Sequence, residues 1–104
     1  EDTPAEVVLS LIDDDDPAVR VAVVQRLAPS MDDESFFKQV LGDQSAAVRA
    51  GLAASASDLM PDSFWTKLGL DRDQDVQQAV WSNPATPITA KVAMKLNGFK
   101  AQES

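Results

Sequence analysis

The chain contains no cysteine, no histidine and no tyrosine among its 104 residues. Without cysteine there is no disulfide, no thiolate nucleophile and no cysteine-ligated zinc or iron–sulfur site. Without histidine, the most common general base and metal ligand is missing. Glycine is also scarce, with four residues and no glycine-rich phosphate loop. These absences predict a protein that is not an enzyme and that carries no cofactor.

Long apolar runs are missing too. No run approaches the roughly 18 residues of a membrane span, and the first residues lack the basic stretch of a signal peptide. We therefore expect a cytoplasmic protein with no membrane partner. The apolar fraction of 44% is too high for a disordered chain. The length suits one domain over residues 1–104.

Acidic residues outnumber basic ones by 17 to 9, which gives a net charge of -8. Residues 1–34 carry ten acidic and two basic residues, whereas residues 35–104 carry seven of each, and residues 76–104 have a net charge of +2. Because carboxylates repel phosphates, we expect no nucleic-acid partner. Charge steering instead favours a basic protein or peptide, especially at the N-terminal end.

Apolar residues recur at spacings of three and four and almost nowhere alternate, which predicts an all-α chain. Seven short helices are expected, and the last of them carries an apolar stripe of Ile88, Val92, Leu96 and Phe99. A capping residue followed by proline marks several helix starts, as at Thr3-Pro4, Asp16-Pro17 and Thr86-Pro87.

An internal repeat organises these helices. Val19-Arg20, Val48-Arg49 and Val76-Gln77 follow one another at steps of 29 and 28 residues, and a second apolar stripe follows each of them. Phe64/Leu68 and Val92/Leu96 are two of these second stripes. Stacked helix pairs bury a continuous core, which predicts a short α-solenoid; a compact bundle is the alternative. The expected units are a half repeat over 3–12, repeats over 13–41, 42–69 and 70–98, and a tail over 99–104.

The residues of the repeat also carry a family resemblance. Valine and arginine at the head of a helix, after an aspartate-rich turn, resemble HEAT-like repeats. The segment Asp75-Val76-Gln77-Gln78-Ala79-Val80-Trp81-Ser82-Asn83-Pro84-Ala85-Thr86-Pro87 is similar to the leucine-rich repeat variant, a bacterial relative. The resemblance implies a right-handed superhelix used as a binding surface. Gln77 and Trp81 depart from that family's arginine and alanine, and its repeat is shorter. A cysteine-ligated cluster known in one member does not carry over.

Arg20 and Arg49 occupy equivalent positions in the repeat. In HEAT-like stacks an arginine at this place often bridges to an aspartate in a neighbouring turn, and Asp16 and Asp43 are the candidate partners. A planar guanidinium with several donors suits such a structural ladder. The alternative is that these arginines bind a ligand.

The run Asp13-Asp14-Asp15-Asp16 suggests a calcium loop, because calcium takes carboxylate oxygens. A standard EF-hand loop begun at Asp13 needs glycine and glutamate where the chain has Ala18 and Val24. We therefore predict no metal site, and expect the run to cap a helix and complement its dipole. Asp13, Asp14 and Asp15 remain candidates for contact with a partner.

Trp81 and a few lysines are the other candidate contact residues. Trp81 either covers the last helix near Leu96 or Phe99, or is exposed as an interface anchor. Lys91 and Lys95 lie one turn apart on one helix face, which is either a solvated face or an ionic docking patch. By analogy with helix-pair solenoids, whose second helices usually line the concave side, we expect a mildly basic groove between acidic edges, lined by Lys38, Lys67, Lys91 and Lys95.

Together these features predict a monomeric, non-enzymatic module that presents a concave helical-repeat face with acidic edges to a protein or peptide. The alternative is a structural terminal segment of a longer repeat protein. A HEAT-like enzyme acting on DNA fits poorly with the net charge of -8. An acidic mimic of nucleic acid suits the charge but not its confinement to one third of the chain.

Overall fold

A computed structural model describes residues 14–99 and contains six α-helices, one short 3-10 helix and, within those residues, no β-strand. Their bounds are α2 (Pro17–Leu27), η2 (Ala28–Ser30), α3 (Glu34–Leu41), α4 (Ala46–Ser55), α5 (Asp62–Gly69), α6 (Gln74–Ser82) and α7 (Ile88–Leu96). The all-α prediction is confirmed. The helix expected over 3–12 lies outside the described residues.

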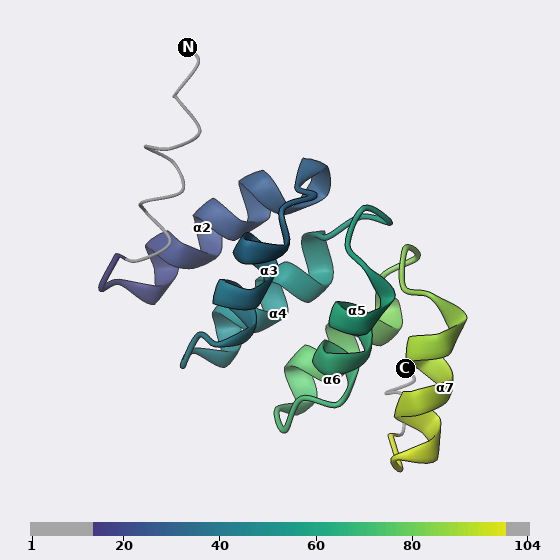
Figure 1. Cartoon of the computed structure of the whole chain (residues 1–104). Coiled ribbons are helices and arrows are strands. Elements are labelled where there is room, and N and C mark those ends of the chain that lie inside the picture. The colour runs from purple at the N-terminus through teal and green to yellow at the C-terminus, as the bar shows by residue number, and fades with distance from the viewer. Residues whose placement is uncertain (1–13, 100–104) are drawn as a thin grey trace.

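Successive α-helices of the chain alternate between two rows, one with α2, α4 and α6 and the other with α3, α5 and α7 (Figure 1). In one row α4 packs against both α2 and α6, and in the other α5 contacts both α3 and α7. The molecule measures 42 × 24 × 24 Å, with α2 towards one end and α7 at the other. Apart from α3, which contacts α4 and α5 equally, each α-helix therefore packs mainly on its counterpart in a neighbouring unit.

Short polar residues begin several of the helices. The carboxylates of Asp16, Asp33 and Asp73 each accept a hydrogen bond from a backbone N–H two residues later, as expected for N-caps. The prediction for Thr86 is wrong: Pro87, not Thr86, is the N-cap residue of α7. The Thr86 hydroxyl instead donates back to the carbonyl oxygen of Val80, at 2.5 Å, because the chain turns sharply between α6 and α7.

Side chains from both rows form one hydrophobic core. The largest fully buried ones are Trp65, Phe37, Leu52, Met60, Leu68, Met94, Val24, Val40, Val48, Val76 and Val80. The ring of Phe37 on α3 lies 5.5 Å from that of Phe64 on α5, so aromatic contacts join neighbouring units. The indole N–H of Trp65 is buried and has no hydrogen-bond partner among the described residues.

Most of the apolar stripe predicted for the last helix lies on the surface and not in the core. Ile88, Val92 and Leu96 are 71%, 48% and 85% exposed, whereas Ala90 and Met94 are fully buried. The reason is the length of the connection. The N-cap residues of α3, α5 and α7 are Asp33, Pro61 and Pro87, which are 28 and then 26 residues apart. The two missing residues turn α7 so that Ala90 and Met94 take the places of Phe64 and Leu68.

Candidate functional site

Arg20 ties the first helix pair to the second. Its Nε donates to a carboxylate oxygen of Asp43 at 2.8 Å, and a second guanidinium nitrogen donates to the other oxygen at 3.1 Å. A third nitrogen donates to the carbonyl oxygen of Asp14 at 2.6 Å. The hydrogen bond with Asp43 raises the pKa of Arg20, and the charges of Asp43 and Asp14 act in the same direction against burial.

Arg49 repeats this arrangement one unit later. Its Nε donates to Asp71 at 2.7 Å and a second nitrogen does so at 3.3 Å, while a third donates to the Asp43 carbonyl oxygen at 2.6 Å. The Arg49 and Asp71 side chains are 7% and 11% exposed. Gln77 stands at the next equivalent position, and its amide donates to the Asp71 carbonyl oxygen. With no guanidinium there, the ladder ends at Gln77.

The aspartates of the ladder also shape the turns in which they lie. The carboxylates of Asp14, Asp43 and Asp71 each accept the backbone N–H two residues later. The sequence left Asp16 and Asp43 open as partners for the arginines: Asp43 pairs with Arg20, while Asp16 caps α2. Asp14 stands at the same turn position as Asp43 and Asp71, yet no arginine within residues 14–99 pairs with its carboxylate.

A shallow hollow of about 400 Å³ opens beside this ladder. Its lining is Leu41, Gly42, Asp43, Gln44, Arg49, Asp71 and Arg72. Two arginines face two aspartates there, and three nitrogens of Arg49 already donate to Asp71 and Asp43. The hollow therefore offers no excess of positive charge for an anionic ligand.

Trp81 and the lysines of α7 form a second cluster at the end of the molecule. The ammonium groups of Lys91 and Lys95 lie 5.3 and 5.4 Å from the centre of the Trp81 ring. At this distance a cation is attracted to the negative face of an indole. The centre of the Phe99 ring lies 5.4 Å from the centre of the same indole. Trp81 is half-buried in this cluster rather than fully covered.

An apolar hollow of about 230 Å³ lies beside these side chains. Its lining is Trp81, Ile88, Lys91, Val92, Lys95 and Leu96, which we call the α7 surface. The two ion pairs within residues 14–99 involve Arg20 and Arg49, so no described carboxylate pairs with Lys91 or Lys95. The α7 surface thus combines exposed apolar side chains with two uncompensated positive charges.

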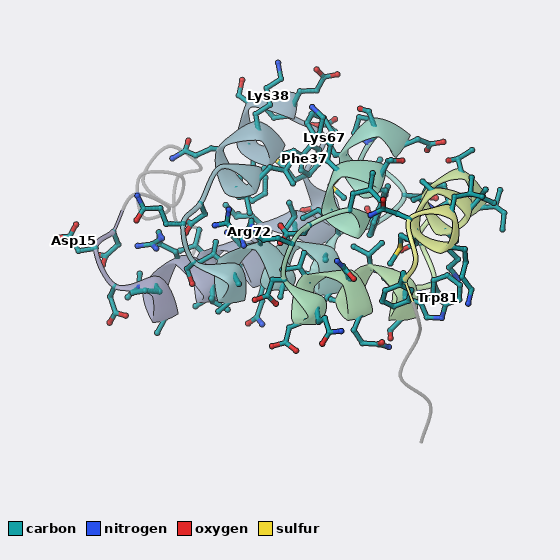
Figure 2. The ribbon with its side chains drawn as sticks, turned by 90° about the horizontal axis from the view of Figure 1, so that it is seen from below. Asp15, Phe37, Lys38, Lys67, Arg72 and Trp81 are labelled. Atoms are coloured by element: carbon teal, nitrogen blue, oxygen red, sulfur yellow. The ribbon has the colours of Figure 1, made fainter. Side chains whose placement is uncertain are left out.

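The other predicted contact residues do not join this cluster. Lys38 and Lys67 are exposed, and Figure 2 shows them together on a side of the molecule away from Trp81. The ammonium group of Lys67 lies 5.8 Å from the Phe64 ring centre. Asp15 lies at the opposite end from Trp81 (Figure 2). Asp13 lies outside the described residues, and within them no cluster of acidic side chains is arranged to hold a metal ion.

One buried polar residue, Asn83, was missed as a structural determinant. The Asn83 side-chain amide donates to the carbonyl oxygens of Ala53 and Ala56, each at 2.9 Å, at the end of α4. Its oxygen accepts the backbone N–H of Ala85 at 2.8 Å. The sequence did signal this residue, because Asn83-Pro84 belongs to the motif that carries the family resemblance.

The exposure of Ile88 was also not predicted from the sequence. The feature of the sequence that could have indicated it is the shorter connection before α7.

Comparisons with protein-family models, curated proteins and solved structures found no match to this chain. The resemblance to HEAT-like repeats and to the leucine-rich repeat variant therefore remains a prediction. Separately, no helix within residues 14–99 combines the length and apolar character needed to cross a bilayer.

Proposed function

We propose that the protein is a non-enzymatic interaction module that holds a protein or peptide partner on its α7 surface. The observation that carries this proposal is the exposure of Ile88, Val92 and Leu96 beside Trp81. A helix with apolar residues on two opposite faces normally buries both, and α7 already packs Ala90 and Met94 against α5. Tryptophan is enriched among the residues that dominate binding energy at interfaces.

The proposal includes a short right-handed α-solenoid as the scaffold. The repeat spacing, the two rows of helices and the ladder all support it. Arg20 bridges residues 13–41 to residues 42–69, and Arg49 bridges the latter to residues 70–98. Contacts of this kind, between each unit and the next, distinguish a solenoid from a bundle.

The remaining parts of the proposal concern chemistry and location. A binding role requires none of the nucleophiles and general bases that the sequence lacks. We place this activity in the cytoplasm, with neither nucleic acid nor membrane as the partner, on the charge and hydropathy arguments given above.

The test is a crosslinking and co-purification experiment on cells of the source organism, read by mass spectrometry. Wild type is compared with Leu96→Ser and with Leu59→Ser. Leu59 is 50% exposed in the turn before α5 and does not line the α7 surface, so it provides a matched control. We expect a specific protein to be recovered with wild type and with Leu59→Ser but not with Leu96→Ser. An identical set of recovered proteins for all three contradicts the proposal.

A second candidate function is that of a terminal segment of a longer helical-repeat protein. Asp14 favours this candidate. Its carboxylate stands at the turn position equivalent to Asp43 and Asp71, each of which pairs with an arginine of the preceding unit. This candidate predicts a Val-Arg pair about 29 residues upstream of Arg20 in the reading frame, before Glu1. A reading frame without such a pair contradicts it.

A further inference from the structure

We infer that the partner of the α7 surface is an acidic amphipathic α-helix. The inference rests on the proposed function and specifies the chemistry of the partner. It follows from the shape of the apolar strip on α7, from the charges along its two edges and from the way the arginine ladder ends.

The apolar strip has the dimensions of a helix-binding site. Ile88, Val92 and Leu96 follow one another at intervals of four residues, so they form one line of about 12 Å along α7. Trp81 of α6 stands beside this line and bounds the hollow. A second helix packs into such a strip with its own apolar residues at i, i+3, i+4 and i+7.

The two edges of the strip differ in charge. Lys91 and Lys95 lie along one edge, and no described carboxylate compensates them. On another side of α7, the Thr89 hydroxyl donates to a carboxylate oxygen of Asp62 at 3.3 Å. A docked helix therefore gains by placing carboxylates along the lysine edge. These ion pairs determine which helix binds and in which orientation, while the apolar strip supplies most of the affinity.

The end of the ladder argues against another repeat as the occupant. Gln77 replaces the arginine that links each unit to the next, and Phe99 stands 28 residues after Asp71, where the next aspartate of the ladder would be. The α7 end thus lacks the ionic link that joins the units. A second copy docked α7 to α7 is also disfavoured, because it brings the Lys91 and Lys95 charges of both copies together.

The experiment uses the full chain and two synthetic peptides of about 18 residues that carry a fluorescent label. Both peptides form an amphipathic helix with leucine at i, i+3, i+4 and i+7. One carries glutamate along one flank of the leucine face, and the other carries lysine at the same places. Fluorescence anisotropy should show micromolar binding of the acidic peptide and binding of the basic peptide weaker by about tenfold or more.

Charge reversal gives the decisive comparison. Lys91→Glu combined with Lys95→Glu should weaken binding of the acidic peptide by about tenfold and strengthen binding of the basic peptide, so that the preference between the two peptides is reversed. Leu96→Ser should weaken the binding of both peptides, and Leu59→Ser should leave the binding of both unchanged. Circular dichroism checks that each variant keeps its helices. Lys95 and Leu96 are exposed, and the described contacts of the Lys91 and Lys95 ammonium groups are with the half-buried Trp81 ring, so these changes should not affect folding.

Trp81 reports where the peptide binds. Trp65 is fully buried, so acrylamide should quench mainly the fluorescence of Trp81. The acidic peptide should reduce this quenching, and the protection should disappear in Trp81→Phe. Quenching that is unchanged at saturating peptide would place the binding elsewhere and overturn the inference.

Three further outcomes overturn the inference. They are equal affinity for the two peptides, binding of neither, and a preference that survives the charge reversal. Concentration-dependent self-association that Leu96→Ser abolishes identifies a second copy as the occupant instead. If the peptides fail while Leu96→Ser still loses a co-purified protein, the inference fails and the proposed function stands. If Leu96→Ser changes nothing in either experiment, both fail.

Discussion

Replacing Arg49 with glutamine separates the two kinds of bond that this arginine makes. Gln77 occupies the equivalent position in the next unit and donates to the Asp71 carbonyl oxygen, as Arg49 donates to that of Asp43. Arg49→Gln should therefore keep the bond to the carbonyl oxygen and lose the paired bonds to the Asp71 carboxylate. The change thus isolates one rung of the ladder without removing the turn contact.

The expected cost follows from the burial of the pair. Removing one partner of a fully buried ion pair costs about 3–5 kcal/mol, because the remaining charge is left desolvated. The Asp71 side chain is 11% exposed and keeps its bond from the backbone N–H of Asp73. We therefore expect Arg49→Gln to lower the free energy of unfolding by about 2–4 kcal/mol. For a domain of this size that is a fall in Tm of roughly 10–20 °C.

Urea denaturation followed by circular dichroism measures this loss. Arg72→Gln is the control, because Arg72 is exposed next to Asp71 and makes no described ion pair. It should change stability by less than about 0.5 kcal/mol. A cycle with Asp71→Asn should show a coupling energy of about 1–3 kcal/mol, since both changes break the same contact. An effect of Arg49→Gln no larger than that of Arg72→Gln, or strict additivity in the cycle, refutes the reasoning.

The remaining predictions concern backbone packing and capping. A Cβ at Gly69 would lie 2.6 Å from Cγ of the buried Met94, so Gly69→Ala should destabilise the fold by about 1–3 kcal/mol. A Cβ at Gly51 meets Val21 at an ordinary 3.6 Å, so Gly51→Ala should stabilise it by about 0.5–1 kcal/mol; urea denaturation decides both, and equal signs contradict the prediction. Asn83→Ala should cost about 2–3 kcal/mol, because two buried carbonyl oxygens lose their donor. Hydrogen exchange should also quicken at the end of α4, and unchanged exchange there would count against the cap.

Local signals in the sequence were sufficient for the helices and for part of the ladder. Caps such as Asp16 act within a few residues, and the steps from Arg20 to Arg49 follow directly from the repeat. The exposed face of α7 was not foreseen, because it depends on a connection that is two residues shorter than the previous one. A change in loop length rotates a helix without altering its apolar spacing. For this reason the spacing of Val92 and Leu96 predicted a core stripe that is in fact exposed.

The role of Trp81 depended on its neighbours rather than on its own position in the repeat. The sequence left open whether it covered the last helix or anchored a partner. In the structure the Trp81 ring contacts the Phe99 ring and lies under the ammonium groups of two lysines. These lysines lie one turn apart on the same face of α7. Only the placement of α7 relative to α6 brings Lys91 and Lys95 to this indole, and that placement is a tertiary property.

The length of the molecule has a consequence for how its charge acts in solution. Asp15 and Trp81 lie towards opposite ends of a body 42 Å long (Figure 2). At physiological ionic strength the Debye length is about 8 Å, so the charges at one end are largely screened from those at the other. A carboxylate that approaches the α7 surface therefore responds mainly to the nearby Lys91 and Lys95 and little to the acidic residues at the far end. The acidic helix that we propose as the partner should therefore be attracted at the α7 end of this acidic domain and repelled at the Asp15 end.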